Sequence, residues 1–320
     1  MKIIPEQGWK SLLRILGRQK GTVLLLGATD SGKTTLARYL VESLVAKRLY
    51  TALIDSDIGQ SGLGLPGTVS MKVFRHQGDV SDYRSGKMTF LGFTNPVKVP
   101  ALMVAMTKRL AGIGQKRADI TVVDTTGLVS GELGKALKMA KIRTLRPAHI
   151  IAIQRGDELE HILSLIGNRG IYRLKTSSAA RKRSASARAA HRKRKLERYF
   201  REQDQYAHML DSSALSFFSQ GRIFCPAGRA LPSGTIIGLN RNDFTIALGI
   251  VESASPEAVF CRTPLKSLKG INRVVCGDMI MPSDESWLPN KSLIYREGRS
   301  MGGRRLIGPS AVHDVDALGK

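Results

Sequence analysis

The chain has 320 residues, of which 42% are hydrophobic and 24% charged, and these are the values of a globular protein. Its net charge of +24 favours a polyanionic partner, with nucleic acid ahead of an acidic membrane surface. Three scattered cysteines, Cys225, Cys261 and Cys276, form no C-x-x-C pair, which argues against a zinc site and fits a reducing compartment. No apolar run approaches the roughly 18 residues of a membrane helix, so we expect a cytoplasmic protein without a membrane partner.

Helices and strands are predicted to alternate over the first half of the chain. An amphipathic helix with Trp9, Leu12 and Leu16 on one face precedes an apolar strand at residues 22–27. Further strands are predicted at residues 51–57, 118–127 and 146–154. This α/β pattern predicts a mostly parallel sheet flanked by helices, with its ligand site at the carboxyl ends of the strands.

The pattern changes near residue 210, where short β-like runs are separated by Gly, Pro and Asn turns. We therefore expect a first domain at residues 1–208, a small C-terminal β-rich domain at 209–306 and a loose tail at 307–320.

A phosphate-binding loop follows the first predicted strand. Residues 27–34, GATDSGKT, fit the pattern G-x-x-x-x-G-K-[ST], in which backbone N–H groups and a helix N-terminus face the phosphates. Lys33 is expected to reach the β- and γ-phosphates, and the Thr34 hydroxyl to ligate Mg²⁺. The sequence thus predicts a P-loop NTPase whose nucleotide contacts come from Gly27, Asp30, Ser31, Gly32, Lys33, Thr34 and Thr35.

Acidic residues end the second and third predicted strands. Asp55 and Asp57 close one strand and Asp124 the other. Opposite a P-loop, one such acid handles Mg²⁺ and another can take a proton from an attacking hydroxyl, although a single Asp can also be a turn or cap residue. The Asp124-Thr-Thr-Gly stretch also fits the D-x-x-G of GTPases, but no Asn-Lys-x-Asp guanine reader ends a later strand.

Residues 181–200, RKRSASARAAHRKRKLERYF, carry nine basic residues and one acid. A solvated helix and a localisation signal are the plainer interpretations. The segment, however, follows the fourth predicted strand, where P-loop kinases place an arginine lid over the transferred phosphoryl group. A nucleic-acid backbone is a second candidate ligand for the same charges.

Several blocks together resemble the polynucleotide 5′-hydroxyl kinases related to the P-loop subunit of the eukaryotic mRNA cleavage factor. The phosphate loop resembles the family's G-x-T-D-x-G-K-[ST]-[ST], and DIGQ at 57–60 with PGT at 66–68 resembles its D-x-G-Q…P-G-T. LGFTNP at 91–96 resembles its G-x-T-S-P block, and residues 183–200 resemble its R-S-x-x-x-R…Y-F lid. The stretch beginning at 238 resembles the C-terminal domain of prokaryotic members, so the likeness spans roughly residues 5–285.

The resemblance implies an enzyme that uses ATP and Mg²⁺ to phosphorylate the 5′-hydroxyl end of RNA, with DNA as a second candidate acceptor, in RNA processing or repair. It implies that Asp57 is the general base and that Thr34 holds Mg²⁺. Asp124, from its place at a strand end opposite the P-loop, is expected to handle the metal as well. The remaining implied roles are catalytic for Lys33, Arg183 and Arg188, and substrate-binding for Gln60, Thr126 and Arg192.

Two departures from the family pattern bear on substrate binding. The eukaryotic members have Asn-Thr-x-Gly-Trp where this chain has Asp124-Thr-Thr-Gly-Leu128, and leucine offers no large stacking face. Only a short helix is predicted before the first strand, where those members carry a β domain. Two alternatives to the kinase remain open at this point: a non-catalytic ATP-binding scaffold of an RNA-processing complex, and a SIMIBI-like ATPase.

Overall fold

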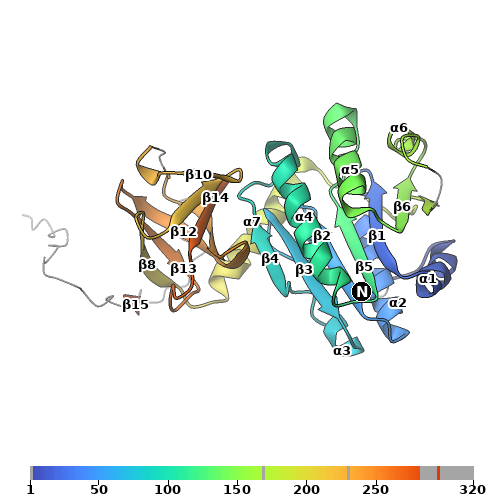
Figure 1. The fold of residues 1–320 in the computed structure, drawn as a ribbon, viewed down its shortest axis with the longest axis horizontal. Helices are drawn as coiled ribbons and strands as arrows, with labels where there is room; N and C mark the ends of the chain where they lie inside the picture. Colours follow the sequence, from blue (N-terminus) through green and yellow to red (C-terminus); the bar gives the residue numbers. More distant parts are fainter. Residues whose placement is uncertain (1–2, 168–169, 229–230, 282–293, 296–320) are drawn as a thin grey trace, which may run out of the picture.

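The computed structural model describes residues 3–167, 170–228, 231–281 and 294–295, and it arranges them around two β-sheets (Figure 1). The predicted tail at 307–320 lies outside the described residues. No described helix is both long enough and apolar enough to cross a lipid bilayer.

The first sheet has seven strands in the order β4-β3-β2-β5-β1-β6-β7. Its strands are β1 (Gly21–Gly27), β2 (Thr51–Ser56), β3 (Thr68–Phe74), β4 (Lys87–Phe90), β5 (Ile120–Thr125), β6 (His149–Gln154) and β7 (Ile171–Lys175). Every neighbouring pair is parallel except those that involve β3, which runs antiparallel to β2 and β4. The expected mostly parallel sheet is therefore confirmed.

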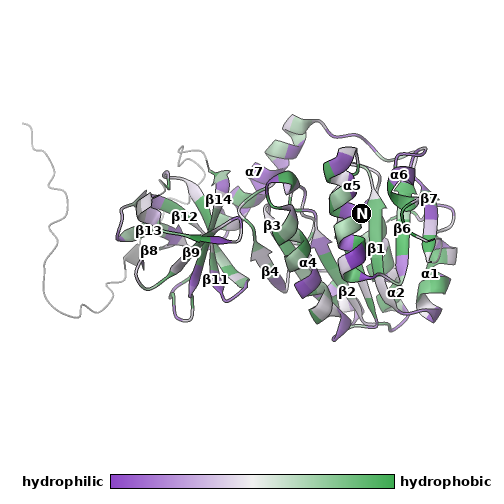
Figure 2. Ribbon diagram, turned by 45° about the horizontal axis from the view of Figure 1, so that its top comes forward, coloured by the Kyte–Doolittle hydropathy of each residue, from purple (hydrophilic) through white to green (hydrophobic). Residues whose placement is uncertain are grey.

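Helices cover both faces of this sheet (Figure 1). The longer ones are α1 (Trp9–Arg18), α2 (Lys33–Ala46), α4 (Pro100–Gln115), α5 (Gly131–Leu145) and α7 (Ala185–Arg201); the short ones are α3 (Gln77–Val80), α6 (Glu160–Leu163) and the 3-10 turn η1 (Pro96–Lys98). Alternate residues of β1 serve the two faces: Leu25 packs in the core under α1 and α2, and Leu24 and Leu26 pack in the core under α4 and α5. Figure 2 shows β1 and β6 mostly in green, and helices with both green and purple residues.

The second sheet has eight strands in the order β10-β9-β14-β11-β12-β13-β8-β15 and confirms the β-rich C-terminal region. Its elements are β8 (Tyr206–Asp211), β9 (Ser216–Ser219), β10 (Arg222–Phe224), β11 (Thr235–Arg241), β12 (Phe244–Ala254), β13 (Ala258–Thr263), β14 (Arg273–Ile280) and β15 (Ile294–Tyr295), with a 3-10 turn η2 (Pro226–Gly228). The boundary expected between residues 208 and 209 falls inside β8, so this sheet begins slightly earlier in the chain; the domain limits themselves stay a prediction.

The two sheets meet through β4, α7 and β14. Phe200 and Leu196 of α7 are buried with Phe90 of β4 and Met279 of β14 in one apolar cluster. The Phe90 amide also donates a hydrogen bond to the Thr245 hydroxyl at 2.8 Å. The carboxyl end of α7 is thus anchored between the sheets, and its amino end extends toward the phosphate loop.

Candidate active site

The phosphate loop joins β1 to α2. Asp30 and Gly32 adopt the left-handed conformation (φ 57° and 93°), which folds the loop back on itself. The Lys33 amine donates hydrogen bonds to the carbonyls of Gly27 and Ala28 at 2.9 and 2.7 Å. Burial lowers the pKa of Lys33, although the nearby carboxylates of Asp124, Asp57 and Asp30 oppose that shift. The loop therefore places a buried cation within electrostatic reach of three acids.

Asp124, at the end of β5, lies directly beside the start of α2. The Thr34 hydroxyl donates a hydrogen bond to Asp124 Oδ2 at 2.6 Å. Asp124 Oδ1 is buried and has no hydrogen-bond partner among the described residues. Burial, reinforced by the negative charge of Asp55, raises the pKa of Asp124 to about 7. A divalent cation near this carboxylate would lower that pKa and keep Asp124 ionised.

The Thr34–Asp124 pair fits a magnesium ion. Mg²⁺ at nucleotide sites takes one or two protein oxygens and completes its shell with phosphates and water. Within the described ranges there is no cluster of three or more His, Cys, Asp or Glu side chains arranged to hold a metal on its own. A hydroxyl and an unpartnered carboxylate oxygen beside a phosphate loop are therefore the donor set that a phosphate-bound Mg²⁺ requires.

Asp55 shapes the loop that follows β2. Its buried Oδ2 accepts hydrogen bonds from the Ser61 hydroxyl at 2.8 Å and from the amides of Gly62 and Leu63 at 2.6 and 2.9 Å. Burial raises the pKa of Asp55, and these donors oppose the rise because they favour the charged form. The carboxylate thereby holds residues 57–64 against the phosphate loop.

Asp57 is more accessible to solvent than Asp55. Its Oδ1 accepts hydrogen bonds from the amides of Gly59 and Gln60, both at 3.1 Å, which fixes the carboxylate as the turn begins. Oδ2 has no hydrogen-bond partner within the described part of the chain, and the side chain is partly exposed. Gln60 donates from Nε2 to the Gly59 carbonyl at 2.7 Å, so it braces the same turn.

Most of the basic segment at 181–200 belongs to helix α7, which begins at Ala185 beside the phosphate loop. Ser184 caps α7 by accepting a hydrogen bond from the Ala187 amide at 3.0 Å. Asp30 of the phosphate loop accepts hydrogen bonds from the Arg183 amide at 2.9 Å and from the Arg188 guanidinium at 3.3 Å. Residues far apart in the sequence therefore place Arg188 at the mouth of the loop.

A family model described as the P-loop of the mRNA cleavage and polyadenylation factor CLP1 matches residues 27–202. This chain belongs to the CLP1 P-loop family. A polyribonucleotide 5′-hydroxyl-kinase of Methanocaldococcus jannaschii is 36% identical over 209 residues, which cover 63% of this chain and 57% of that protein. One of Pyrococcus furiosus is 34% identical over 199 residues, covering 62% of this chain and 56% of its own length. The chain thus matches little more than half the length of these relatives.

A solved structure of wild-type Clp1p in complex with Pcf11p has the same fold. It covers 85% of this chain and 78% of the Clp1p chain with a TM-score of 0.66, at 14% sequence identity. Because the superposition includes most of the described residues, it supports the α/β architecture of this CLP1-family chain beyond the matched phosphate-loop region.

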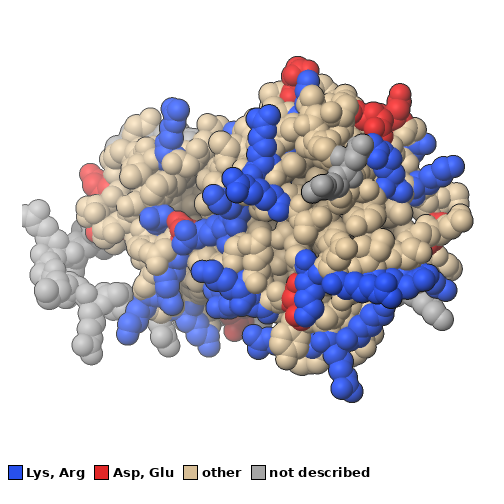
Figure 3. All heavy atoms as spheres, turned by 45° about the vertical axis from the view of Figure 1, so that its right-hand side comes forward, with Lys and Arg blue, Asp and Glu red and all other residues tan. Residues whose placement is uncertain are grey.

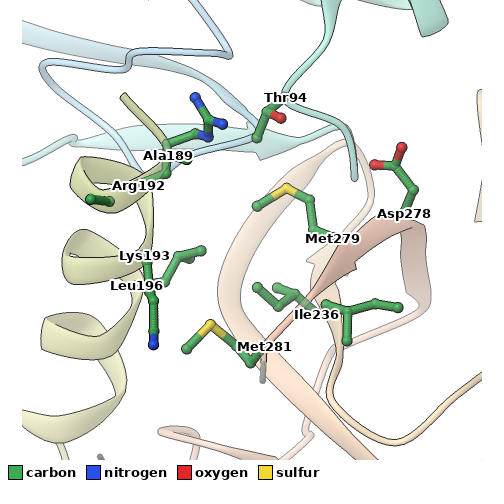
Figure 4. A pocket seen from close by; sticks show the side chains of 11 residues that line it. Thr94, Ala189, Arg192, Lys193, Leu196, Ile236, Asp278, Met279 and Met281 are labelled. Atoms are coloured by element: carbon green, nitrogen blue, oxygen red, sulfur yellow. The ribbon is translucent and has the colours of Figure 1, made fainter. Parts of the chain in front are cut away.

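The remaining expected site residues lie in different surroundings. Arg192 lines a groove of about 490 Å³ between α7 and β14, together with Thr94 and Met279 (Figure 4). Thr126 is buried, and the following Gly127 packs so closely on the phosphate loop that a Cβ there would lie 2.5 Å from Thr29 Cα. Arg192 thus lies one turn along α7 from Arg188 and lines this groove, whereas Arg188 contacts Asp30. The roles given to Arg192, Thr126 and the exposed Thr35 stay predictions.

Sequence reasoning missed two fully buried lysines of α5 beneath the site. Lys138 donates to the Thr125 hydroxyl at 2.9 Å and to the Thr126 carbonyl. Lys141 donates to the Ser56 hydroxyl at 2.6 Å. Both therefore brace the carboxyl ends of β2 and β5. The available signal is their spacing, because they occupy the same helical stripe as the buried apolar residues of α5 (Leu137, Ile142 and Leu145).

The contact of Lys195, in α7, with the loop after β2 was also not predicted. The Lys195 amine donates to the Ser61 carbonyl at 2.8 Å and ties the middle of α7 to the loop that carries Asp57.

Replacing Lys141 by methionine should change the pH dependence of stability. Burial lowers the pKa of Lys141 from 10.5 to about 8 in the folded protein. Between those pH values the unfolded chain binds more protons at Lys141 than the folded chain does. The free energy of unfolding of the wild type therefore increases as the pH rises. Relative to Lys141→Met, the gain should be about 3 kcal/mol from pH 8 to 10.5. Denaturant unfolding of both proteins across this range measures it, and parallel curves would contradict it.

Proposed function

We propose that this chain is an ATP-dependent polynucleotide 5′-hydroxyl kinase that phosphorylates RNA. The observation that carries the proposal is the convergence of Lys33, the accessible Asp57 carboxylate and Arg188 around one phosphate loop. An ATP-binding scaffold needs the loop but no accessible base, and an ATPase needs no arrangement for a second substrate. The names of the archaeal relatives support the same assignment.

In the proposed reaction, Asp57 Oδ2 accepts the proton of the acceptor's 5′-hydroxyl as its oxygen attacks the γ-phosphorus of ATP. The bond from the γ-phosphorus to the bridging oxygen breaks, which leaves ADP and a 5′-phosphorylated strand. Backbone N–H groups of the phosphate loop and the Lys33 amine hold the phosphates, and Arg188 neutralises charge on the transferred group. Such reactions need in-line positioning and charge neutralisation more than covalent participation of the protein.

Magnesium is part of the proposal. Thr34 and Asp124 would hold the ion, and Mg²⁺ would supply neutralisation of the β- and γ-phosphate charge. The structure supports this through the unpartnered, buried Asp124 Oδ1 beside the Thr34 hydroxyl.

The acceptor is inferred to be RNA, with DNA as the second candidate. Leu128, at the position of the eukaryotic tryptophan, is half-buried and packs on the core cluster under α4 and α5. Stacking on a residue at this position is therefore not expected to discriminate among acceptors. A cytoplasmic location is also proposed, and it rests on the three scattered cysteines of the sequence.

The function is tested by transfer of label from γ-labelled ATP to 5′-hydroxyl RNA and DNA oligonucleotides of the same sequence. Wild type should label RNA in the presence of Mg²⁺, and Lys33→Ala should abolish labelling because the phosphates lose their buried cation. A 5′-phosphorylated RNA is the matched negative acceptor. ATP hydrolysis without labelled oligonucleotide would contradict the kinase and favour the ATPase alternative; ATP binding with neither product would favour the scaffold.

A further inference from the structure

The edge of the first sheet opposite the candidate active site is strongly basic. Nine exposed side chains lie in or next to the loops at the amino ends of the parallel strands: Arg18, Lys20, Lys47, Arg48, Arg75, Lys116, Arg117, Arg143 and Arg146. We call this set the amino-end face. Figure 3 shows Lys and Arg side chains gathered along the lower edge of this domain, the edge at which α3 lies in Figure 1.

These charges are largely uncompensated. Lys20 pairs with Asp119 at 2.6 Å, and the other eight side chains form no salt bridge with any residue that the structure describes. Because unpaired like charges repel one another, the face is electrostatically unfavourable unless an anion binds it.

Two of the arginines also occupy unfavourable backbone positions. Arg48 and Arg146 follow the ends of α2 and α5 with φ of 62° and 45°, in the left-handed region where helices ordinarily place glycine. Glycine would be conformationally easier at both positions. The chain therefore has arginine at two positions where the backbone favours glycine. A function of this face that depends on positive charge would explain that choice.

The face also has a concave aromatic element. A groove of about 560 Å³ is lined by Arg48, Tyr50, Arg75 and His76. Tyr50 is 49% exposed, and its amide is held by Asp119 Oδ2 at 2.9 Å. An exposed ring in a groove that two arginines also line can provide stacking for a base and charge for the neighbouring phosphates. An amphipathic membrane-binding helix would instead place apolar side chains beside its basic ones, to insert between lipids.

We propose that the amino-end face binds the body of the RNA whose 5′ end lies at the candidate active site. This inference rests on the proposed function. Tyr50 immediately precedes β2 and Asp57 immediately follows it, so the two regions are about 20 Å apart along the strand. Because β2 is buried, an RNA must follow a longer route over the surface, which at about 3.4 Å per stacked nucleotide favours acceptors of well over six nucleotides. The kinase would therefore bind long acceptors more tightly than short ones through a contact remote from the chemistry.

The sharpest variant is Arg48→Gly with Arg146→Gly, since it removes two charges and relieves both left-handed arginines. Its melting temperature should equal or exceed that of wild type, which excludes misfolding as the cause of any loss. A second variant adds Arg75→Ala and Arg117→Ala. The matched control is Lys266→Ala with Lys269→Ala, which removes two exposed charges next to the second sheet.

Equilibrium binding of 5′-phosphorylated RNAs of about 5 and about 25 nucleotides tests the proposal without requiring catalysis. The fourfold variant should bind the long RNA at least about 10-fold more weakly and the short RNA unchanged, with a salt slope lower by up to about 3. The control should match wild type for both lengths. If phosphate transfer is absent but this length-dependent loss is seen, the proposed function fails while the RNA-binding face stands.

Three outcomes would overturn the inference. Equal loss of affinity for both RNA lengths would place the effect at the active site. An unchanged affinity for the long RNA would remove RNA from this face. Loss of binding to phosphatidylserine vesicles, with RNA affinity intact, would assign the charges to a membrane surface instead.

Discussion

Replacing Asp57 by asparagine should lower kcat for phosphate transfer by about 10²–10⁴-fold, the range lost when a positioned general base is removed. Asparagine keeps an oxygen that can accept the hydrogen bonds from the amides of Gly59 and Gln60, so the turn should survive. What it loses is the ability to take the 5′-hydroxyl proton. Single-turnover transfer at saturating ATP and RNA measures the effect, and ATP affinity should stay near that of wild type.

Asp55→Asn is the matched comparison for Asp57→Asn. Asp55 is buried and holds residues 57–64 through hydrogen bonds to Oδ2 from the Ser61 hydroxyl and two amides. An amide in its place keeps one acceptor oxygen but loses the charge that these donors stabilise, so melting temperature and activity should fall together. Loss of activity in Asp57→Asn with no change in melting temperature would show that Asp57 acts in the reaction, whereas Asp55 acts by holding the loop. A transfer rate within about threefold of wild type would remove Asp57 from the base role.

The parts of the site that follow from local sequence were predictable. Apolar runs such as TVLLLG and ITVVDT are buried strands of a parallel sheet, and the carboxyl ends of such strands converge on one edge. This is why Lys33 and Asp124 were expected to meet, and the structure brings them together.

Other parts depend on contacts that no local pattern encodes. Strand β3 was not predicted: its residues alternate as in a strand, but no local pattern shows that they pair antiparallel to β2 within a mostly parallel sheet. The contact between Asp30 and Arg188 joins positions 158 residues apart. Lys138 and Lys141 were overlooked because lysine is almost never fully buried, and only the folded helix shows that both reach hydroxyl or carbonyl acceptors.

The Asp30–Arg188 ion pair holds the start of α7 at the phosphate loop. The carboxylate is 3.3 Å from the guanidinium, and both side chains are less than one-third exposed. Helix α7 is held elsewhere by the hydrogen bond from Lys195 to the Ser61 carbonyl and by the buried Phe200. Removing one arginine side chain should therefore leave α7 in place and test chemistry alone.

Replacing Arg188 by alanine should lower kcat by at least about 10²-fold, toward the 10³–10⁵ associated with an arginine that neutralises a transferred phosphoryl group. ATP affinity should change little, because this charge acts mainly as the transition state forms. Arg188→Lys should recover only part of the rate, since an ammonium keeps the charge but lacks the planar donor pair. The matched control is Arg192→Ala, one turn along the same helix. Because Arg192 lines the groove between α7 and β14, this variant should have a higher KM for RNA and a kcat near that of wild type. Equal kcat values for Arg188→Ala and wild type would exclude Arg188 from the reaction. Equal effects of the two alanine variants would mean that α7 acts through its overall positive charge rather than through one positioned guanidinium.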